Sequence, residues 1–162
     1  MKKIGSTSDF TDARDRELYS NFRQLLRSAD MPLAGMFAAA AAMPASRFWV
    51  SERRAADVIG SMLGGDACAV TAHMNPQKRR MYLEIFRRVK AIMAADRNLC
   101  MTHAVDAVVC SAAPEFYLTP KSAKVIIYRI RRRLRAERRR IEHKNSALRA
   151  ALSSLRPEER KS

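Results

Sequence analysis

Residues 45–59 read A-S-R-F-W-V-S-E-R-R-A-A-D-V-I, and residues 113–127 read A-P-E-F-Y-L-T-P-K-S-A-K-V-I-I. The two stretches match without a gap at an offset of 68 positions, so that Phe48-Trp49-Val50-Ser51 corresponds to Phe116-Tyr117-Leu118-Thr119. An aromatic pair, a hydroxyl residue and a basic residue kept in one order indicate a tandem duplication of a three-helix unit. The alternative is a coincidental likeness between the starts of two unrelated helices.

Local start and stop signals outline the second unit. Asn75-Pro76 places an N-cap residue before a proline at the first helical position, and apolar residues then recur at helical spacing. A second helix is expected to start near Thr102 and to end before Pro114. Phe116 to Leu118 then form a short extended connector, and Thr119-Pro120 is a strong start signal for a third helix.

The first unit follows the same plan. Helices are expected over roughly 12–28 and 32–43, and a third helix is expected from the Ser51 cap to Gly64-Gly65. The predicted organisation is a flexible N-terminus over 1–11, a first three-helix unit over 12–65, a joint over 66–75, a second three-helix unit over 76–140, a helical extension over 141–156 and a polar tail over 157–162.

The composition favours an all-α fold. Apolar residues make up 48% of the 162 residues, enough for a core, whereas glycine (5) and proline (6) are too rare for the turns of a β-sandwich or barrel. No apolar run approaches the roughly 18 residues of a membrane span, and acidic residues follow the basic start where a signal peptide needs apolar ones. Three cysteines without a C-x-x-C pair are typical of reduced thiols, so we expect a cytoplasmic protein without a membrane partner.

Positive charge is concentrated near the C-terminus. The chain carries 31 Lys+Arg against 16 Asp+Glu, and the last 43 residues contribute +11 of the net charge of +15. Arginine supplies most of this charge, and its guanidinium fork matches the geometry of phosphate. We therefore expect nucleic acid as the partner. An anionic membrane surface, an acidic protein and a merely solvated helix are the alternatives.

The order helix, helix, connector, helix is that of a helix-turn-helix DNA-binding unit, although the connector is longer than the usual turn. If Ala123, Ile127 and Ile130 face the core, the opposite face of the third helix turns cations and hydroxyls toward a major groove. The predicted nucleic-acid contacts on this helix and its arginine-rich continuation are Lys121, Ser122, Lys124, Tyr128, Arg129, Arg131, Arg132, Arg133, Arg135, Arg138, Arg139 and Arg140. The matching helix of the first unit offers Arg53 and Arg54 as a secondary contact, because Asp57 on the same face would repel phosphate.

The segment Phe116-Tyr117-Leu118-Thr119, echoed by Phe48-Trp49-Val50-Ser51, resembles a segment of small basic proteins from bacterial chromosomes and mobile elements. In those proteins an F-Y-[LV]-[ST] segment precedes a basic helix. The resemblance covers most of the chain. It implies a helix-turn-helix-like fold and supports the duplication, but it implies no activity.

Apolar residues recur every seven positions along the last helix, at Ile127, Leu134, Ile141, Leu148 and Leu155. Such a repeat beside arginines is typical of a basic zipper helix, but the partner positions Glu137, Lys144 and Ala151 are polar or small. Docking of the stripe on the protein's own first unit is the alternative. The sequence therefore favours a monomer and leaves a homodimer through the C-terminal helix open.

Residues for catalysis or metal binding form no recognisable motif. Cys100 and His103 lie three positions apart, and Cys68, His73 and Cys110 are further conceivable ligands, but no pair has zinc-finger spacing. The sequence holds no P-loop, G-x-S-x-G, H-E-x-x-H or G-x-G-x-x-G motif. We predict no enzyme, no metal site and no cofactor.

The sequence therefore predicts a nucleic-acid-binding protein, a regulator or accessory protein of helix-turn-helix type that reads duplex DNA. The alternative is a structural or interaction protein, associated with a phage or with ribosomes, whose arginine-rich helix binds RNA or an acidic partner.

Overall fold

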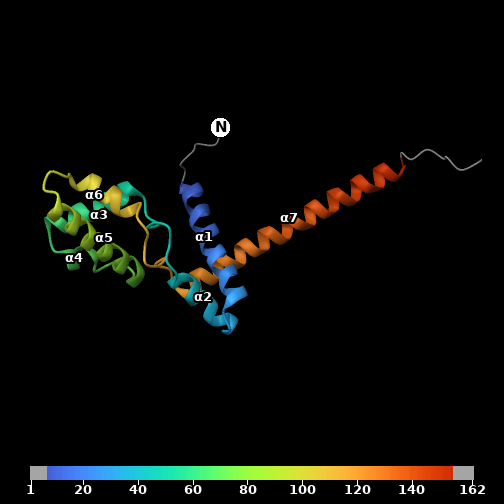
Figure 1. Ribbon diagram of the computed structural model, residues 1–162, viewed down its shortest axis with the longest axis horizontal. Helices are drawn as coiled ribbons and strands as arrows, with labels where there is room; N and C mark the ends of the chain where they lie inside the picture. The colour runs from blue at the N-terminus through green and yellow to red at the C-terminus, as the bar shows by residue number, and fades with distance from the viewer. Residues whose placement is uncertain (1–6, 155–162) are drawn as a thin grey trace, which may run out of the picture. The chain divides into compact units, whose positions relative to one another are not determined.

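The computed structural model describes residues 7–154, which form helices without a β-strand and confirm the all-α prediction for this range. The helices are α1 (Thr7–Ser28), α2 (Leu33–Ala42), α3 (Glu52–Gly64), α4 (Ala67–Thr71), α5 (Pro76–Ala95), α6 (Met101–Val109) and α7 (Pro120–Ser154) (Figure 1). The chain divides into a compact unit over 1–127 and a second unit over 128–162. Within the described range, no helix combines the length and the hydropathy needed to cross a bilayer.

The predicted caps are present at three helix starts. The Ser51 hydroxyl oxygen accepts a hydrogen bond of 3.3 Å from the backbone N–H of Arg54. The Asn75 amide oxygen accepts one of 2.9 Å from the backbone N–H of Lys78. The Thr119 hydroxyl oxygen accepts one of 3.0 Å from the backbone N–H of Ser122. Each cap satisfies a donor that the first turn of a helix leaves without a partner. Proline follows the cap at the start of α5 and of α7, as the sequence predicted.

Several boundaries differ from the prediction. Helix α1 already begins at Thr7, so residues 7–11 are helical, while residues 1–6 lie outside the described range. The predicted joint over 66–75 contains the short helix α4, capped by the Asp66 carboxylate. Helix α7 runs on to Ser154, and the predicted polar tail over 157–162 lies outside the described range. The predicted boundaries at 65 and 75 both fall inside the compact unit.

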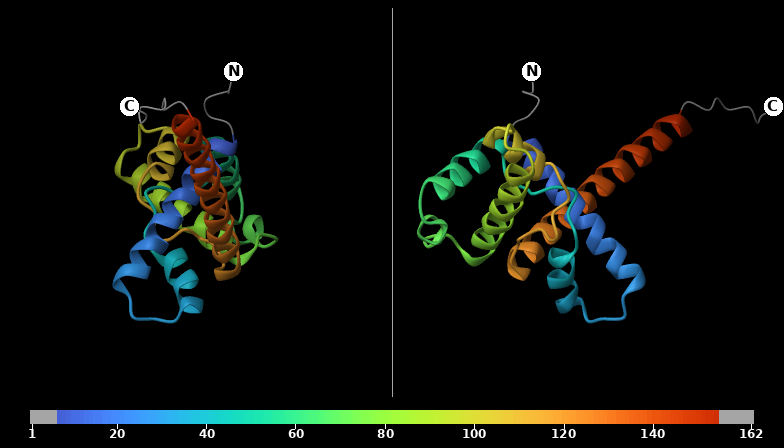
Figure 2. Two further views of the ribbon diagram at one scale, coloured as in Figure 1. Left: turned by 90° about the vertical axis from the view of Figure 1, so that its right-hand side faces the viewer. Right: turned by 60° about the vertical axis from the view of Figure 1, so that its left-hand side comes forward.

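The helices of the compact unit pack across the two predicted halves. Helix α3 packs against α5 and α6, whereas α1 packs against α2 (Figures 1 and 2). The first turns of α7 bury Ala123, Ile126 and Ile127, and the Lys124 ammonium lies 5.9 Å from the ring centroid of Phe37 on α2. The third helix of each predicted unit therefore contacts helices of the other unit.

Two connectors, one between α2 and α3 and the other between α6 and α7, are hydrogen-bonded to each other. Ala45 and Ala113 exchange two backbone hydrogen bonds of 3.0 Å, which form an isolated antiparallel bridge. Phe48 donates its N–H to the carbonyl of Val109, and Phe116 donates to the carbonyl of Ala41, both at 3.0 Å. Every residue in this set has its counterpart 68 positions away, which is the offset of the sequence match.

The connectors bury one member of each aromatic pair. Phe48 is 0% exposed and Phe116 is 4% exposed, whereas Trp49 and Tyr117 are only partly buried. This confirms the prediction that the phenylalanines enter the core and that the amphipathic rings stay at its edge. The Tyr117 ring stacks on Phe48 with centroids 6.1 Å apart, so the two connectors also share a side-chain contact.

Truncation of the buried connector phenylalanine should destabilise the fold strongly. Phe116→Ala removes a buried ring and leaves a cavity, so we expect the free energy of unfolding to fall by ~3–5 kcal/mol in urea denaturation. The control Val125→Ala removes methyl groups from a side chain that is 59% exposed, and it should change stability by less than about 0.5 kcal/mol. A loss below about 1 kcal/mol for Phe116→Ala would contradict a core role.

Candidate nucleic-acid interface

The first turn of α7 presents the predicted reader residues to solvent. Lys121, Ser122 and Lys124 are exposed, and so is Val125 beside them. The Thr119 hydroxyl, which caps the helix, also donates a hydrogen bond to the Ser122 hydroxyl oxygen at 2.9 Å. Both lysines are therefore accessible from solvent, although Lys124 also contacts the Phe37 ring and Ser122 has a partner within the cap.

Residues 128–154 are the continuation of α7, and they hold the remaining contacts that were predicted on this helix. This stretch contains ten Lys and Arg residues against two Glu residues. Tyr128 is 43% exposed, Arg129 and Arg131 are partly buried, and the arginines from Arg132 to Arg140 are mostly exposed. Within residues 7–154, six of the arginines form no ion pair: Arg131, Arg132, Arg135, Arg138, Arg139 and Arg140. We call these six the arginine run.

The secondary contact predicted on α3 has a structural role in part. Arg53 and Arg54 are exposed, and Asp57 nearby is exposed as well, as the helical spacing implied. Burial raises the pKa of the Tyr82 phenol on α5, and the Arg54 guanidinium beside it opposes that rise. Arg54 therefore contributes to the contact between α3 and α5, and only Arg53 is a plain surface cation.

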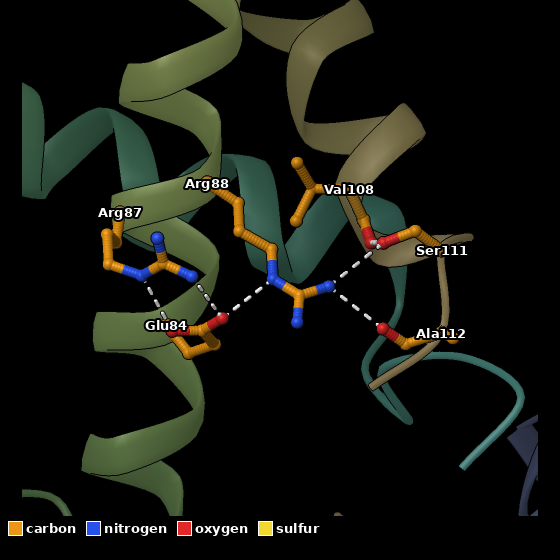
Figure 3. Close-up of polar contacts among 6 residues, drawn as sticks. All are labelled: Glu84, Arg87, Arg88, Val108, Ser111 and Ala112. Carbon is orange, nitrogen blue, oxygen red and sulfur yellow. Dashed lines mark hydrogen bonds and ion pairs between the residues drawn. The ribbon is translucent and has the colours of Figure 1, made fainter. Parts of the chain in front are cut away.

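An ion-pair cluster on α5 holds the connector that leads to α7 (Figure 3). The Glu84 carboxylate accepts hydrogen bonds from Arg87 at 2.8 and 2.9 Å and from Arg88 at 2.7 Å. Arg88 also donates to the backbone carbonyl of Ala112 at 2.8 Å, and its guanidinium carbon lies 5.1 Å from the Phe48 ring centroid. Arg87 and then Arg88 stabilise the ionised carboxylate and lower the pKa of Glu84 from 4.5 to about 2.

Tyr117 adopts a backbone conformation that few aromatic residues adopt. Its φ of 53° lies in the left-handed region, where the Cβ atom is crowded, at a cost of about 1–2 kcal/mol. The ring is held by its stack on Phe48 and by the Arg80 guanidinium 5.9 Å from its centroid. Burial, with Glu84 and Glu115 nearby, raises the pKa of the Tyr117 phenol to about 12, so the hydroxyl stays protonated.

A surface hollow of about 630 Å³ lies beside this connector. Its lining residues are Ala42, Arg80, Leu83, Glu84, Arg87, Pro114, Glu115 and Tyr117. Arg80 forms an ion pair with Glu115, and Arg87 forms one with Glu84. Because both arginines already have carboxylate partners, the hollow offers no uncompensated positive charge to an anion.

This cluster of arginines and glutamate was not among the predicted functional residues. A signal was present, because Arg87 and Arg88 follow Glu84 at the i+3 and i+4 spacings that bring side chains together on one helix face. The contact of Arg88 with the second connector had no local signal, because it joins residues 24 positions apart.

The described residues hold no group of three or more His, Cys, Asp or Glu side chains arranged for a metal ion. Cys100 serves as the N-cap position of α6, and His103 lies exposed in its first turn. Cys68, Cys100 and Cys110 are free thiols.

Comparisons with protein-family models, with curated proteins and with solved structures give no match to this chain. The function therefore has to be argued from its own residues.

The low pKa of Glu84 predicts an acid-sensitive contribution to stability. The carboxylate is more acidic in the folded state, so its contribution is present above pH 4.5 and is lost as the pH falls toward about 2. Glu84→Gln should lower the free energy of unfolding by about 2 kcal/mol at pH 7, allowing for the partial exposure of the pair, and by much less near pH 2. Urea denaturation at several pH values measures this difference.

The matched control is Glu137→Gln on α7, because Glu137 is exposed and forms no ion pair within residues 7–154. It should leave stability unchanged at every pH. A gap between wild type and Glu84→Gln that stays constant from pH 7 to pH 2 would show that the carboxylate charge contributes nothing.

Proposed function

We propose that this protein binds nucleic acid through α7, and that duplex DNA is its main target. The observation that carries the proposal is the charge of residues 128–154, where ten Lys and Arg residues stand against two Glu residues. Six of these arginines form no ion pair within the described residues. Such a field is costly through self-repulsion, and phosphate groups neutralise it while releasing counterions.

The distribution of the arginines around the helix supports a groove as the binding site. Consecutive helical residues are rotated by about 100°, so Arg131–Arg133 and again Arg138–Arg140 each cover a wide arc. An α-helix in the major groove lies between two phosphate backbones, which approach it from both sides. The exposed apolar side chains Leu134, Ile141 and Leu148 occupy the remaining arc, away from the phosphates.

The start of α7 supports reading of base edges in the manner of a helix-turn-helix protein. Lys121 and Lys124 are exposed at the N-terminal end of the helix, which is the end that approaches bases in that mode. Val125 is exposed beside them and offers an apolar contact for a thymine methyl group. We propose a regulator or accessory protein in which these residues give sequence preference and the arginine run gives affinity.

We further propose that the compact unit arose by tandem duplication. The reciprocal hydrogen bonds of the connectors, in which every residue has its counterpart 68 positions away, support this proposal. The carbonyls of Pro44 and Ala112, also 68 apart, each accept from a side chain on the first helix of a half, Asn21 at 3.4 Å and Arg88 at 2.8 Å. In this scheme the second half binds DNA, because its third helix continues into the arginine run, whereas α3 carries two arginines beside two acidic residues.

The proposal is tested by salt-titrated binding to a DNA duplex, a DNA single strand and a structured RNA. On duplex DNA, log K should fall linearly with log salt, with a slope of about −0.9 for each neutralised phosphate. Tighter binding to the RNA than to the duplex would instead support the alternative partner. Equal and weak binding to all three would overturn the nucleic-acid proposal.

The arginine run should act on all sequences alike. Arg139→Ala with Arg140→Ala should weaken duplex binding and reduce the salt slope by about 0.9 for each phosphate that the variant no longer neutralises. The matched control is Arg79→Ala with Arg97→Ala, which removes two exposed cations of the compact unit and should leave the slope unchanged. Equal effects of the two double variants would indicate a response to net charge alone.

The start of α7 should act on the preferred sequence. Lys121→Ala with Lys124→Ala should cost ~1–3 kcal/mol on a duplex selected by the wild-type protein and less on an unrelated duplex. The control is Arg53→Ala on α3, which should cost less because Asp57 shares its face. If Arg53→Ala abolishes binding and the lysine variant does not, the reader is α3 and the proposal for α7 is wrong.

A further inference from the structure

Residues 128–154 of α7 expose a stripe of apolar side chains. Leu134, Ile141, Leu148 and Leu152 are exposed by 43%, 49%, 59% and 58%, values that are high for such side chains. Ile127, which begins the seven-residue repeat, is fully buried and belongs to the core of the compact unit. The exposed part of the stripe therefore begins at Leu134, after the turns of the helix that are buried in the compact unit.

The spacing of Ile141, Asn145, Leu148 and Leu152 defines the register of this stripe. Four positions after Ile141 and Leu148 stand Asn145 and Leu152, so the spacing along the face is four, three and four residues. This is the spacing of the inner positions of a coiled coil, and the asparagine at one of these positions lowers the stability of the pairing. We call Ile141, Asn145, Leu148 and Leu152 the C-terminal seam.

We propose that the C-terminal seam pairs with the same seam of a second copy of the chain, and that the two helices run antiparallel. In this arrangement Ile141 faces Leu152 of the partner subunit, and Asn145 faces Leu148 of the partner subunit. Each contact occurs twice because the pairing is two-fold symmetric. A seam of about two heptads forms a weak and reversible dimer, because short helices gain little from pairing.

The charges beside the seam select the antiparallel direction. Glu142 and Arg149 lie on the same flank of the seam. Antiparallel pairing brings Glu142 beside Arg149 of the partner subunit, and Arg149 beside Glu142 of the partner subunit. Parallel pairing would instead place Glu137 beside Glu142 and Lys144 beside Arg149. The antiparallel dimer therefore gains two opposite-charge pairs, whereas the parallel dimer has only like-charge pairs on its flanks.

The arginine run also favours this direction. Parallel pairing would place the two runs side by side, with strong repulsion between them. In the antiparallel dimer the centres of the two runs lie about 30 Å apart along the axis, from the helical rise of 1.5 Å per residue. That separation exceeds the screening length of about 8–10 Å at physiological salt, so the repulsion is small.

The experiment is sedimentation of the full-length, nuclease-treated protein across a concentration series from ~10 to ~500 µM, with far-UV circular dichroism as a check on folding. The wild type should dimerise reversibly, and the dimer should depend little on salt, because the seam is mainly apolar and the repulsion between the arginine runs is small. Nucleic-acid binding should weaken with salt, so the two proposals fail independently. A wild-type chain that stays monomeric over the whole series overturns the proposal.

Charge-swap variants test the direction. Glu142→Arg places arginine against Arg149 of the partner subunit twice, so the dissociation constant should rise about tenfold. Arg149→Glu should have a similar effect, whereas the control Arg139→Glu, on the outer face of the same helix, should not weaken the dimer. An equimolar mixture of the Glu142→Arg and Arg149→Glu chains should associate as a heterodimer more tightly than either chain alone. Tighter self-association of Glu142→Arg would mean parallel pairing and would overturn the proposal.

Discussion

The backbone exchange between Ala45 and Ala113 is the contact on which the compact unit depends. It fixes the two connectors side by side at the point where the chain passes between its groups of helices. From this point one connector leads into α3 and the other into α7. Phe48 and Phe116 enter the core three residues beyond the bridge, so the hydrogen bonds and the aromatic packing stabilise the same place. Two connectors without regular structure are thereby given fixed positions.

The arginines of the compact unit and those of the arginine run differ in whether they have carboxylate partners. In the compact unit, several arginines have carboxylate partners: Arg14 with Asp15, Arg47 with Glu52, Arg80 with Glu115, and Arg87 and Arg88 with Glu84. Of these pairs, Arg47 with Glu52 and Arg80 with Glu115 join a connector to a helix, and Arg88 also donates a hydrogen bond to the second connector. The arginine run of α7 has no such partners among the described residues. This contrast supports a partner of the arginine run that lies outside the chain.

The proposed dimer and the proposed nucleic-acid contact use different parts of one helix. The arginine run lies before residue 141, and the C-terminal seam begins at that residue. An antiparallel dimer would present two arginine runs at opposite ends of a shared seam. Two separated cationic surfaces would bind two sites on one duplex or bridge two duplexes, which would link the oligomeric state to the proposed role as an accessory protein.

Local physics made most of the elements predictable. The caps at Ser51, Asn75 and Thr119 are formed as expected because a cap depends on residues only two or three positions away. The burial of Phe48 and Phe116, with Trp49 and Tyr117 at the edge, followed from the amphipathic character of the side chains. The helix α4 was missed because five residues near two glycines carry too little periodicity to reveal a helix.

The sequence by itself determined the helical class, the capped starts of α3, α5 and α7, the buried aromatic residues and the concentration of charge on the last helix. Each of these depends on composition or on neighbours within one or two turns. Only the tertiary structure decided that α3 packs on α5 and α6, that the connectors pair at Ala45 and Ala113, and that Arg88 holds the second connector. These contacts join residues that are distant in the sequence, 24 positions apart for Arg88 and Ala112 and 68 for Ala45 and Ala113. Their choice depends on which surfaces fit together in three dimensions, and a one-dimensional pattern carries no record of that fit.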